Sequence, residues 1–192
     1  VGSGKTIVSL LAVINVIESG FQSALMAPTE ILAKQHYELA KKIFESINIK
    51  IDFITGKTEY KNRKEILRNL KEGKTNFLIG THSLFQKKIS FKKLGFVIID
   101  EQHKFGVRQR SELAKKGGDN CDVLLMSATP IPRTMMMSLY GDMDISKITE
   151  KPKNRKKIIT LSKPESKINE LWPFIKKKIF ENNQVFWVCP LI

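Results

Sequence analysis

The 192-residue sequence predicts an α/β fold, with a parallel sheet and helices on both of its faces. Short apolar runs rich in β-branched residues alternate with longer amphipathic segments, which is typical of strands joined by crossover helices. A glycine-rich turn opens directly into an apolar segment, and two apolar runs end in acidic or small hydroxyl residues. Hydrophobic residues make up 42% of the chain, which is enough for a core and excludes a disordered chain.

The glycine-rich turn comes first, as Val1-Gly2-Ser3-Gly4-Lys5-Thr6. It matches the end of the phosphate-binding pattern G-x-x-x-x-G-K-S/T, in which glycines let backbone N–H groups point at phosphate oxygens. In that pattern the lysine reaches the β- and γ-phosphates, and the final hydroxyl ligates Mg²⁺. The candidate ATP-binding residues are therefore Gly2, Ser3, Gly4, Lys5 and Thr6, with Lys5 also catalytic and Thr6 also a metal ligand.

Residues 7–14 form the apolar segment after the turn, and we expect them to be a buried helix. The N-terminus of such a helix adds positive potential beneath bound phosphates. A strand normally precedes this kind of loop, and none precedes it here. We therefore expect the sequence to be a fragment that lacks its first strand.

Strands and helices alternate through the next part of the chain. Strands are expected over residues 23–27, 50–54 and 77–80. Helices are expected over residues 30–44 and 60–71. No internal repeat or low-complexity segment interrupts this order.

An acidic pair follows the run Phe96–Ile99, which reads as a strand buried on both faces. The carboxyl end of a central strand is where open α/β sheets place ligand chemistry. Asp100 is a candidate Mg²⁺ ligand, and Glu101 is a candidate base that orients and deprotonates the attacking water. Acidic residues also favour helix N-termini, so the pair gains its meaning from the phosphate-binding turn in the same chain.

A further apolar run, over residues 123–126, predicts another strand, and it ends in Ser127-Ala128-Thr129. The hydroxyls of Ser127 and Thr129 are placed to hydrogen-bond to His103 and so to link hydrolysis to domain movement. A plain Ser/Thr turn before Pro130 is the alternative interpretation.

Several motifs together resemble superfamily-two helicases: the phosphate-binding turn, the Asp-Glu-x-His motif and the Ser-Ala-Thr motif, in this order. Residues 27–36 (APTEILAKQH) and 80–84 (GTHSL) are similar to further motifs of that superfamily. Residues 100–110, 127–134 and 188–192 resemble the RecG family of branched-DNA helicases in particular. Gln102 fits that family, whereas the related transcription-repair coupling translocases usually have Glu at this position.

The resemblance implies a RecA-like P-loop NTPase fold, with ATP and Mg²⁺ as cofactors and branched or forked duplex DNA as partner. It also implies residues that couple the nucleotide to DNA movement: Gln102, His103, Ser127, Ala128, Thr129 and Arg133. We expect Arg133 to couple or to make a structural hydrogen bond, because in these motors the arginine finger comes from the second motor domain.

A DNA track is also implied by the resemblance, at the carboxyl ends of the first strands. Its residues are Pro28, Thr29, Glu30, Thr55, Gly56, Thr81 and His82. Short hydroxyls and N–H groups at helix N-termini hold phosphates without reading sequence. The basic clusters Lys61/Arg63/Lys64 and Lys87/Lys88/Lys92/Lys93 either extend this track or form solvated helix faces. His36 and His82 are core or surface residues, and neither is expected to bind a metal.

The composition changes after residue 150, where Pro, Asn and a run of basic residues predict an exposed linker over 151–157. Residues 1–150 are then the first RecA-like domain, and residues 158–192 are the truncated beginning of a second one. In that last part we expect a strand over 158–161, a helix over 165–181 kinked near Pro173, and a strand over 185–189. Such a piece cannot complete its own sheet.

The balance of 33 Lys and Arg residues against 19 Asp and Glu residues gives a net charge of +14, which favours a polyanionic partner. Codon bias toward Lys is an equally good explanation of the charge by itself. Cys121 and Cys189 are too far apart in sequence for a CxxC pair, and we expect both to be core thiols in a reducing cytoplasm. The longest apolar stretch is too short to cross a bilayer, so no membrane partner is expected.

These expectations converge on the ATP-binding half of a DNA helicase or translocase that acts on branched DNA in recombination and repair. The alternatives are a transcription-repair coupling translocase, whose partner is RNA polymerase, and a P-loop switch module without a nucleic-acid role. Because the nucleotide should lie between two RecA-like domains, we expect the isolated chain to be nearly inactive.

Overall fold

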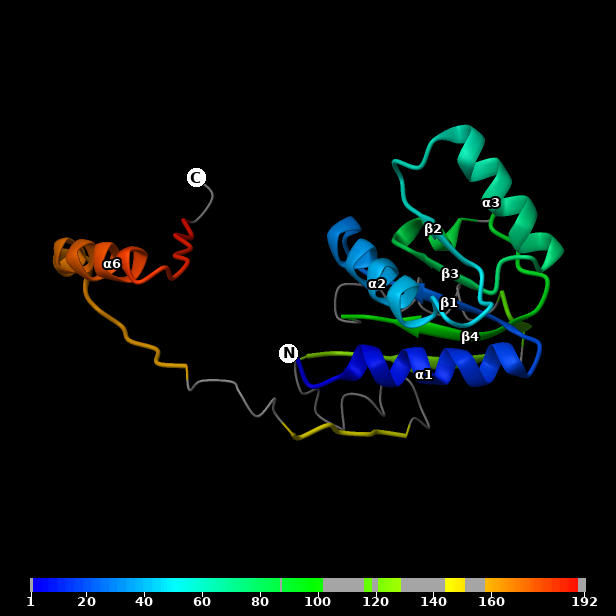
Figure 1. The fold of residues 1–192 in the computed structure, drawn as a ribbon, viewed down its shortest axis with the longest axis horizontal. Coiled ribbons are helices and arrows are strands. Elements are labelled where there is room, and N and C mark those ends of the chain that lie inside the picture. Colours follow the sequence, from blue (N-terminus) through cyan, green and yellow to red (C-terminus); the bar gives the residue numbers. More distant parts are fainter. Residues whose placement is uncertain are drawn as a thin grey trace. The chain divides into compact units, whose positions relative to one another are not determined.

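The computed structural model describes residues 2–86, 88–101, 116–118, 121–128, 144–150 and 158–189. The chain divides into two compact units, Val1–Pro152 and Lys153–Ile192. The expected linker over 151–157 lies outside the described residues. Figure 1 shows the ribbon of both units, and each unit has its own helices.

A five-stranded parallel sheet forms the centre of the first unit (Figure 1). Its strands are β1 (Gln22–Met26), β2 (Ile51–Ile54), β3 (Phe77–Gly80), β4 (Leu94–Ile99) and β5 (Asp122–Leu125). Their order across the sheet is β2-β3-β1-β4-β5, and every neighbouring pair is parallel. The α/β class and the parallel sheet expected from the sequence are therefore confirmed.

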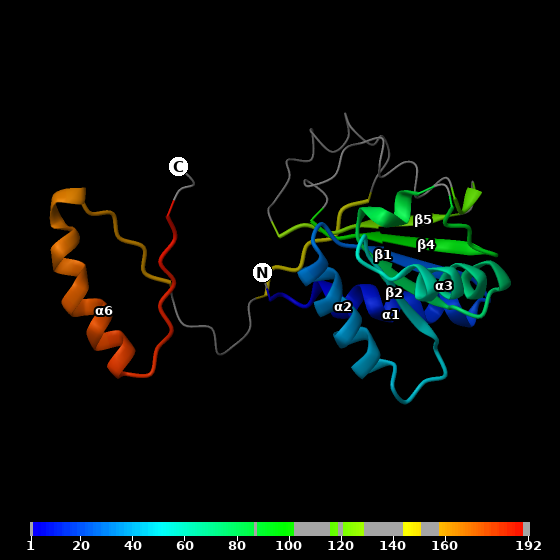
Figure 2. The same ribbon diagram turned by 90° about the horizontal axis from the view of Figure 1, so that it is seen from above.

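Helices cover both faces of this sheet. The helices α1 (Lys5–Glu18) and α2 (Glu30–Ile43) pack on one face, and Figure 2 shows them on the same side of β4 and β5. Their side chains form one core cluster, in which Leu10 and Val13 meet Leu25 and Ile98. The helix α3 (Tyr60–Glu72) and the 3-10 turn η1 (His82–Phe85) supply the opposite core cluster. Alternate residues of each strand enter opposite clusters, as the two-residue strand period requires.

Local sequence signals fix where these helices begin and end. The hydroxyl of Thr29 caps α2 by accepting a hydrogen bond from Leu32 N at 3.3 Å. Gly73 ends α3 with a φ of 79°, in the left-handed region that glycine enters without a steric penalty. The observed boundaries lie within two residues of the expected ones throughout the five strands and the helices α2 and α3.

The first helix differs from its expectation, because α1 is not buried all round. Ser9, Leu10 and Val13 are its buried residues, whereas Ile7, Val8 and Leu11 are each at least two-fifths exposed. A helix on one face of a sheet buries only the stripe that faces the strands, and residues 7, 8 and 11 lie off that stripe. The prediction of a buried helix over 7–14 was therefore wrong for Ile7, Val8 and Leu11.

The second unit contains a 3-10 segment over Glu165–Glu170 and the helix α6 (Leu171–Phe180). The strands expected over 158–161 and 185–189 are absent, and these residues are exposed without regular structure. A lone strand has no partner for its backbone N–H and C=O groups, so an apolar run does not form one without a neighbouring sheet. The irregular residue is Lys167, with φ −97° and ψ 15°, rather than Pro173. Pro173 lies in the first turn of α6, where its missing N–H costs no helical hydrogen bond.

Candidate nucleotide and nucleic-acid site

The candidate site residues lie along one edge of the sheet, because parallel strands all end on the same side. Across this edge the sheet order places the ends of β2, β3 and β1 next to one another, followed by those of β4 and β5. The first three ends carry the expected DNA-binding residues, and the last two carry the acidic pair and Ser127-Ala128. The expected DNA-binding residues and the expected nucleotide-site residues therefore lie on neighbouring parts of one edge.

Backbone hydrogen bonds hold neighbouring strand ends together beyond the strands themselves. Ala27 N donates to Gly80 O at 3.0 Å, and Asp100 N donates to Met26 O at 2.9 Å. Met126 N donates to Ile99 O at 2.9 Å. These contacts fix the loops that follow β1, β4 and β5 relative to one another.

The phosphate-binding turn has the backbone that its glycines allow. Gly2 has a φ of 81° and Gly4 a φ of 91°, both in the left-handed region. A Cβ atom at Gly4 would meet no atom within 4 Å, so glycine is required there for its conformation and not for space. Gly4 is the N-cap of α1, and Lys5 and Thr6 are its first two residues. Thr6, a half-buried residue, therefore lies at the helix N-terminus, where anions are favoured.

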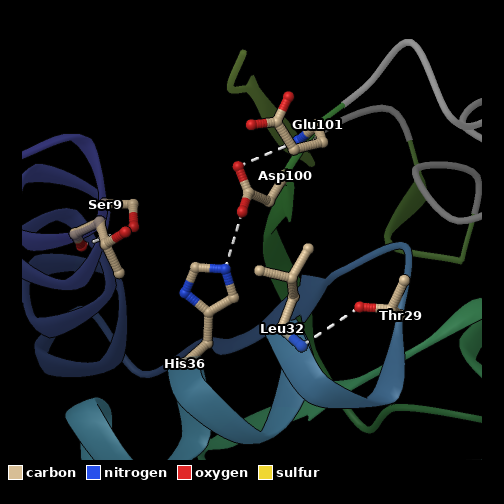
Figure 3. Close-up of polar contacts among 7 residues, drawn as sticks. Ser9, Thr29, Leu32, His36, Asp100 and Glu101 are labelled. Atoms are coloured by element: carbon tan, nitrogen blue, oxygen red, sulfur yellow. Dashed lines mark hydrogen bonds and ion pairs between the residues drawn. The ribbon is translucent and has the colours of Figure 1, made fainter. Parts of the chain in front are cut away.

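Asp100 is held from two directions at the end of β4. Its Oδ2 lies 2.8 Å from Nε2 of His36, and its Oδ1 accepts a hydrogen bond from Glu101 N at 3.0 Å (Figure 3). Both side chains of the His36–Asp100 pair are about nine-tenths buried, with 9% and 12% of their surface exposed. The carboxylate is thus fixed in one orientation.

Glu101 follows with a φ of 47°, one of two non-glycine residues with positive φ in the described part of the chain. A left-handed backbone costs an ordinary residue about 1–2 kcal/mol, and such strain concentrates at functional sites. Glu101 directly follows the buried Asp100, and its side chain lies at the carboxyl edge of the sheet (Figure 3).

Several of the candidate DNA-binding residues make contacts within the fold. The Thr29 hydroxyl caps α2, and the partly exposed Glu30 side chain forms an ion pair with Lys57 at 3.0 Å. Thr55 is buried, and its Oγ1 accepts a hydrogen bond from Lys57 N at 3.2 Å. Thr81 is also buried, whereas Gly56 and His82 are exposed. A phosphate at this edge would therefore contact backbone N–H groups and the exposed residues Gly56 and His82, rather than the hydroxyls of the buried Thr55 and Thr81.

Arg63 links two of the expected DNA-binding loops. Its guanidinium donates to Thr55 O at 3.3 Å and to Gln86 Oε1 at 2.6 Å. Lys93 Nζ lies 4.3 Å from the centroid of the Phe21 ring. These two members of the basic clusters have contacts within the chain, whereas Lys61, Lys64, Lys88 and Lys92 are exposed.

Four of the six expected coupling residues lie outside the described residues: Gln102, His103, Thr129 and Arg133. The expected contact of Ser127 and Thr129 with His103 therefore stays a prediction. Lys87 of the second basic cluster also lies outside the described residues. Ser127 and Ala128, half-buried after β5, are described at the edge next to Asp100.

His36 is the site residue that sequence reasoning missed, since its pattern fits a core and a surface position equally. The helix α2 buries Ala33, His36 and Ala40, which are spaced three and four residues apart on one helix face. That spacing was the available signal, because a histidine on a buried helix face needs a polar partner. Its partner is far away in sequence, which the spacing does not reveal.

The oxygen donors at this edge suit a hard cation such as Mg²⁺, which prefers carboxylate, hydroxyl and phosphate oxygens to nitrogen or sulfur. Over the described ranges, no group of three or more His, Cys, Asp or Glu side chains is arranged to hold a metal ion. Among the helices of the described residues, none is both long and apolar enough to cross a membrane.

Comparison with known proteins gives consistent relatives. The sequence model of the DEAD/DEAH box helicase family matches residues 1–138. The chain is 45% identical to the ATP-dependent DNA helicase RecG of Thermotoga maritima over 192 residues, and 45% identical to that of Bacillus subtilis. Both alignments cover all of this chain, but only 24% and 28% of those relatives. The chain thus spans about a quarter of the length of the proteins that it matches.

Solved structures agree with the sequence relatives. A structure of RecG bound to a three-way DNA junction aligns with a TM-score of 0.81 and 41% identity, over all of this chain and 25% of that one. The DNA-bound helicase MrfA aligns with a TM-score of 0.54 and 16% identity, over 69% of this chain and 19% of that one. The second likeness supports the fold alone.

Proposed function

Because the chain belongs to the DEAD/DEAH box helicase family, we propose that it is the ATP-binding half of a RecG-type DNA translocase. The whole protein would act on branched or forked duplex DNA in recombination and repair, in the cytoplasm. The observation that carries this proposal is the agreement of the entire chain, in both sequence and fold, with RecG bound to a three-way DNA junction. The division of one sheet edge between candidate DNA-binding and nucleotide-binding residues supports it.

ATP binding is assigned to the turn at residues 2–6, whose N–H groups and Lys5 would neutralise the β- and γ-phosphates. Thr6 and Asp100 would hold Mg²⁺, which supplies charge neutralisation on the phosphate oxygens when bound. Glu101 would accept a proton from the attacking water, because it follows the ordered Asp100 at the same edge. In the whole protein a second RecA-like domain would complete the nucleotide site.

The DNA strand would lie across the ends of β2, β3 and β1, against Gly56, His82 and the N-terminus of α2. Contacts of this kind go to phosphates, so binding should be tolerant of sequence and sensitive to salt. ATP-driven movement of the second domain relative to this half would then step the motor along duplex DNA.

The test is ATP hydrolysis by the intact protein and its Glu101→Gln variant, with forked, linear duplex and single-stranded DNA compared at one salt concentration. We expect forked DNA to stimulate the wild type most strongly. We expect the variant to retain nucleotide binding and to lose hydrolysis by a factor of roughly 10² or more, as removal of a general base does. Equal rates on all three DNAs would contradict the branched-DNA assignment, and stimulation that requires RNA polymerase would favour a transcription-repair coupling translocase.

A further inference from the structure

His36 connects the candidate DNA-binding residues with the candidate nucleotide site. It is on α2, whose first residues belong to the candidate DNA track, and its ring reaches Asp100 on the nucleotide side (Figure 3). The residue is 7% exposed, and its Nε2 is 2.8 Å from Asp100 Oδ2. In its Nε2–H tautomer the ring donates this hydrogen bond to the Asp100 carboxylate.

The contact leaves Asp100 with limited freedom. One carboxylate oxygen is bonded to the His36 ring and the other to Glu101 N, while Asp100 N is bonded to Met26 O at 2.9 Å. Each carboxylate oxygen retains a second lone pair that can accept a hydrogen bond from a water molecule. His36 therefore selects the direction in which those lone pairs point.

Two features of α2 would allow a displacement at its N-terminus to reach His36. His36 is six residues beyond Glu30, which is about 9 Å along the axis at 1.5 Å per residue. The Thr29 hydroxyl caps the helix, so a hydrogen bond joins the loop after β1 to the first turn of α2. The other buried residues of α2 are Ala33 and Ala40, and neither can make a side-chain hydrogen bond to Asp100.

We propose that His36 is a positioning residue that transmits DNA contact at the N-terminus of α2 to the metal-binding carboxylate of Asp100. This inference rests on the proposed function, because it takes the loop before α2 as part of the DNA track. Partners that orient a metal-binding residue typically change metal affinity by about 10–100-fold when removed.

The variants are chosen by the geometry of the donor. His36→Gln places an amide nitrogen the same number of bonds from Cα as Nε2, so it can donate to Asp100. His36→Asn reaches only the position of Nδ1, and His36→Leu fills space without donating. Thermal unfolding of all three intact proteins checks that each is folded. Even if the Leu variant does not fold, the Asn and Gln pair still separates donation from packing.

One readout does not depend on turnover: the Mg²⁺ concentration for half-maximal tightening of a fluorescent ADP analogue, with binding in EDTA as reference. We expect His36→Asn and His36→Leu to raise this concentration about tenfold and to leave binding in EDTA unchanged. His36→Gln should stay within about threefold of the wild type. Loss in all three variants, or in none, would overturn the positioning role.

The second readout is the ratio of ATP hydrolysis rates with and without forked DNA, at saturating Mg²⁺. We expect this ratio to fall for His36→Asn and to be restored in His36→Gln. Weakened Mg²⁺ binding with a wild-type ratio would overturn transmission from DNA. A wild-type protein that forked DNA does not stimulate would instead be a failure of the proposed function, and the fluorescence readout would still test the contact itself.

Discussion

At the scale of single residues, Gln22 shows how one side chain fastens separate segments. Its amide nitrogen donates to Leu70 O at 2.9 Å and to Thr75 O at 2.7 Å. Its amide oxygen accepts from Lys92 N at 2.8 Å and from Lys93 N at 2.9 Å. The residue is 4% exposed; the two hydrogen bonds that it donates are buried, and the two that it accepts are partly buried. One glutamine thus joins the end of α3, the loop before β3 and the approach to β4.

Replacing Gln22 with Met should lower the free energy of unfolding by about 3 kcal/mol or more. The volume is similar, but four backbone groups lose a buried partner, and each unsatisfied group costs about 1–3 kcal/mol before relaxation. Urea denaturation followed by circular dichroism measures the change. The control is Gln35→Met on the exposed side of α2, where a change within about 0.5 kcal/mol is expected. Equal midpoints for the two variants would contradict the role of Gln22.

The two cysteines differ from the expectation that both are core thiols. Cys121 is half-buried, but Cys189 is exposed, because its apolar neighbours form no strand and pack into no sheet. Burial, with a contribution from the charge of Asp122, raises the pKa of the Cys121 thiol to about 11. At about pH 8 roughly 0.1% of such a thiol is ionised, and the thiolate is the reactive form.

A chromogenic disulfide reagent should therefore modify this chain in two phases. We expect Cys189 to react fast and Cys121 to react slowly until the protein is denatured. Cys189→Ser should remove the fast phase and Cys121→Ser the slow one. The rate of the slow phase should rise as the pH approaches the raised pKa. A single fast phase of two thiols would show that Cys121 is more accessible than its position implies.

Residue types at the site were predictable from the sequence, but their contacts were not. Gly2 and Gly4 predict a turn with positive φ, and Asp-Glu after a buried strand predicts a ligand-binding site at the carboxyl edge of the sheet. By contrast, the His36–Asp100 contact joins residues 64 positions apart. Only the strand order, which brings β1 next to β4, makes α2 a neighbour of Asp100.

At the scale of elements, the pairing of β2 with β3 depends on a glycine at its last rung. Gly80 lies opposite Ile54, and a Cβ atom there would come within 2.3 Å of Ile54 O. That neighbour is a backbone atom and cannot turn aside. The rung lies immediately before Thr55 and Thr81, so a shift here would move two of the candidate DNA-binding loops apart.

Gly80→Ala should lower the free energy of unfolding by about 1–3 kcal/mol, in the range for overpacked sites. The matched substitution is Gly56→Ala, in the loop after β2 at the same edge, where an added Cβ meets nothing within 4 Å. Thermal unfolding of both variants measures the contrast. If Gly80→Ala is as stable as Gly56→Ala, the strand ends tolerate more separation than their hydrogen bonds suggest.

The elements of the first unit were predictable because their signals are local. Each strand is a short apolar run, and strands buried on both faces, such as β3 and β4, carry the strongest signal. The same signal failed at residues 185–189, where an apolar run pairs with no strand among the described residues of its own unit. Apolar composition therefore predicts that a segment should be buried, and pairing with a neighbour decides whether it becomes a strand.

At the scale of the whole molecule, strand order was the part that the sequence did not provide. Pairing joins Ser23 with Phe77 and Gln22 with Leu94, which are contacts over more than fifty residues. The second unit has no buried residue in its described part, and large side chains such as Phe180 and Phe186 are 88% and 85% exposed. The described residues of this unit, 158–189, form no strand.

The isolated 192-residue chain should therefore hydrolyse ATP at least about a thousandfold more slowly than the intact protein with forked DNA. By resemblance, the arginine finger belongs to the second motor domain, and such a residue contributes about 10³–10⁵ in turnover. Phosphate release from both proteins at equal concentration measures the ratio. A chain that keeps the DNA-stimulated rate of the intact protein would contradict the need for two domains.

Both tryptophans of the chain, Trp172 and Trp187, lie in the second unit and stack with ring centroids 5.4 Å apart and planes 9° from parallel. The first unit contains none, so light absorbed by indole alone excites only residues of the Lys153–Ile192 unit. Intrinsic fluorescence then follows this unit without any label, while the sheet and helices of the other unit dominate the far-ultraviolet circular dichroism. The unfolding of each unit can therefore be followed separately, by fluorescence for one and by circular dichroism for the other. A nucleotide that binds only the first unit should leave the tryptophan emission unchanged.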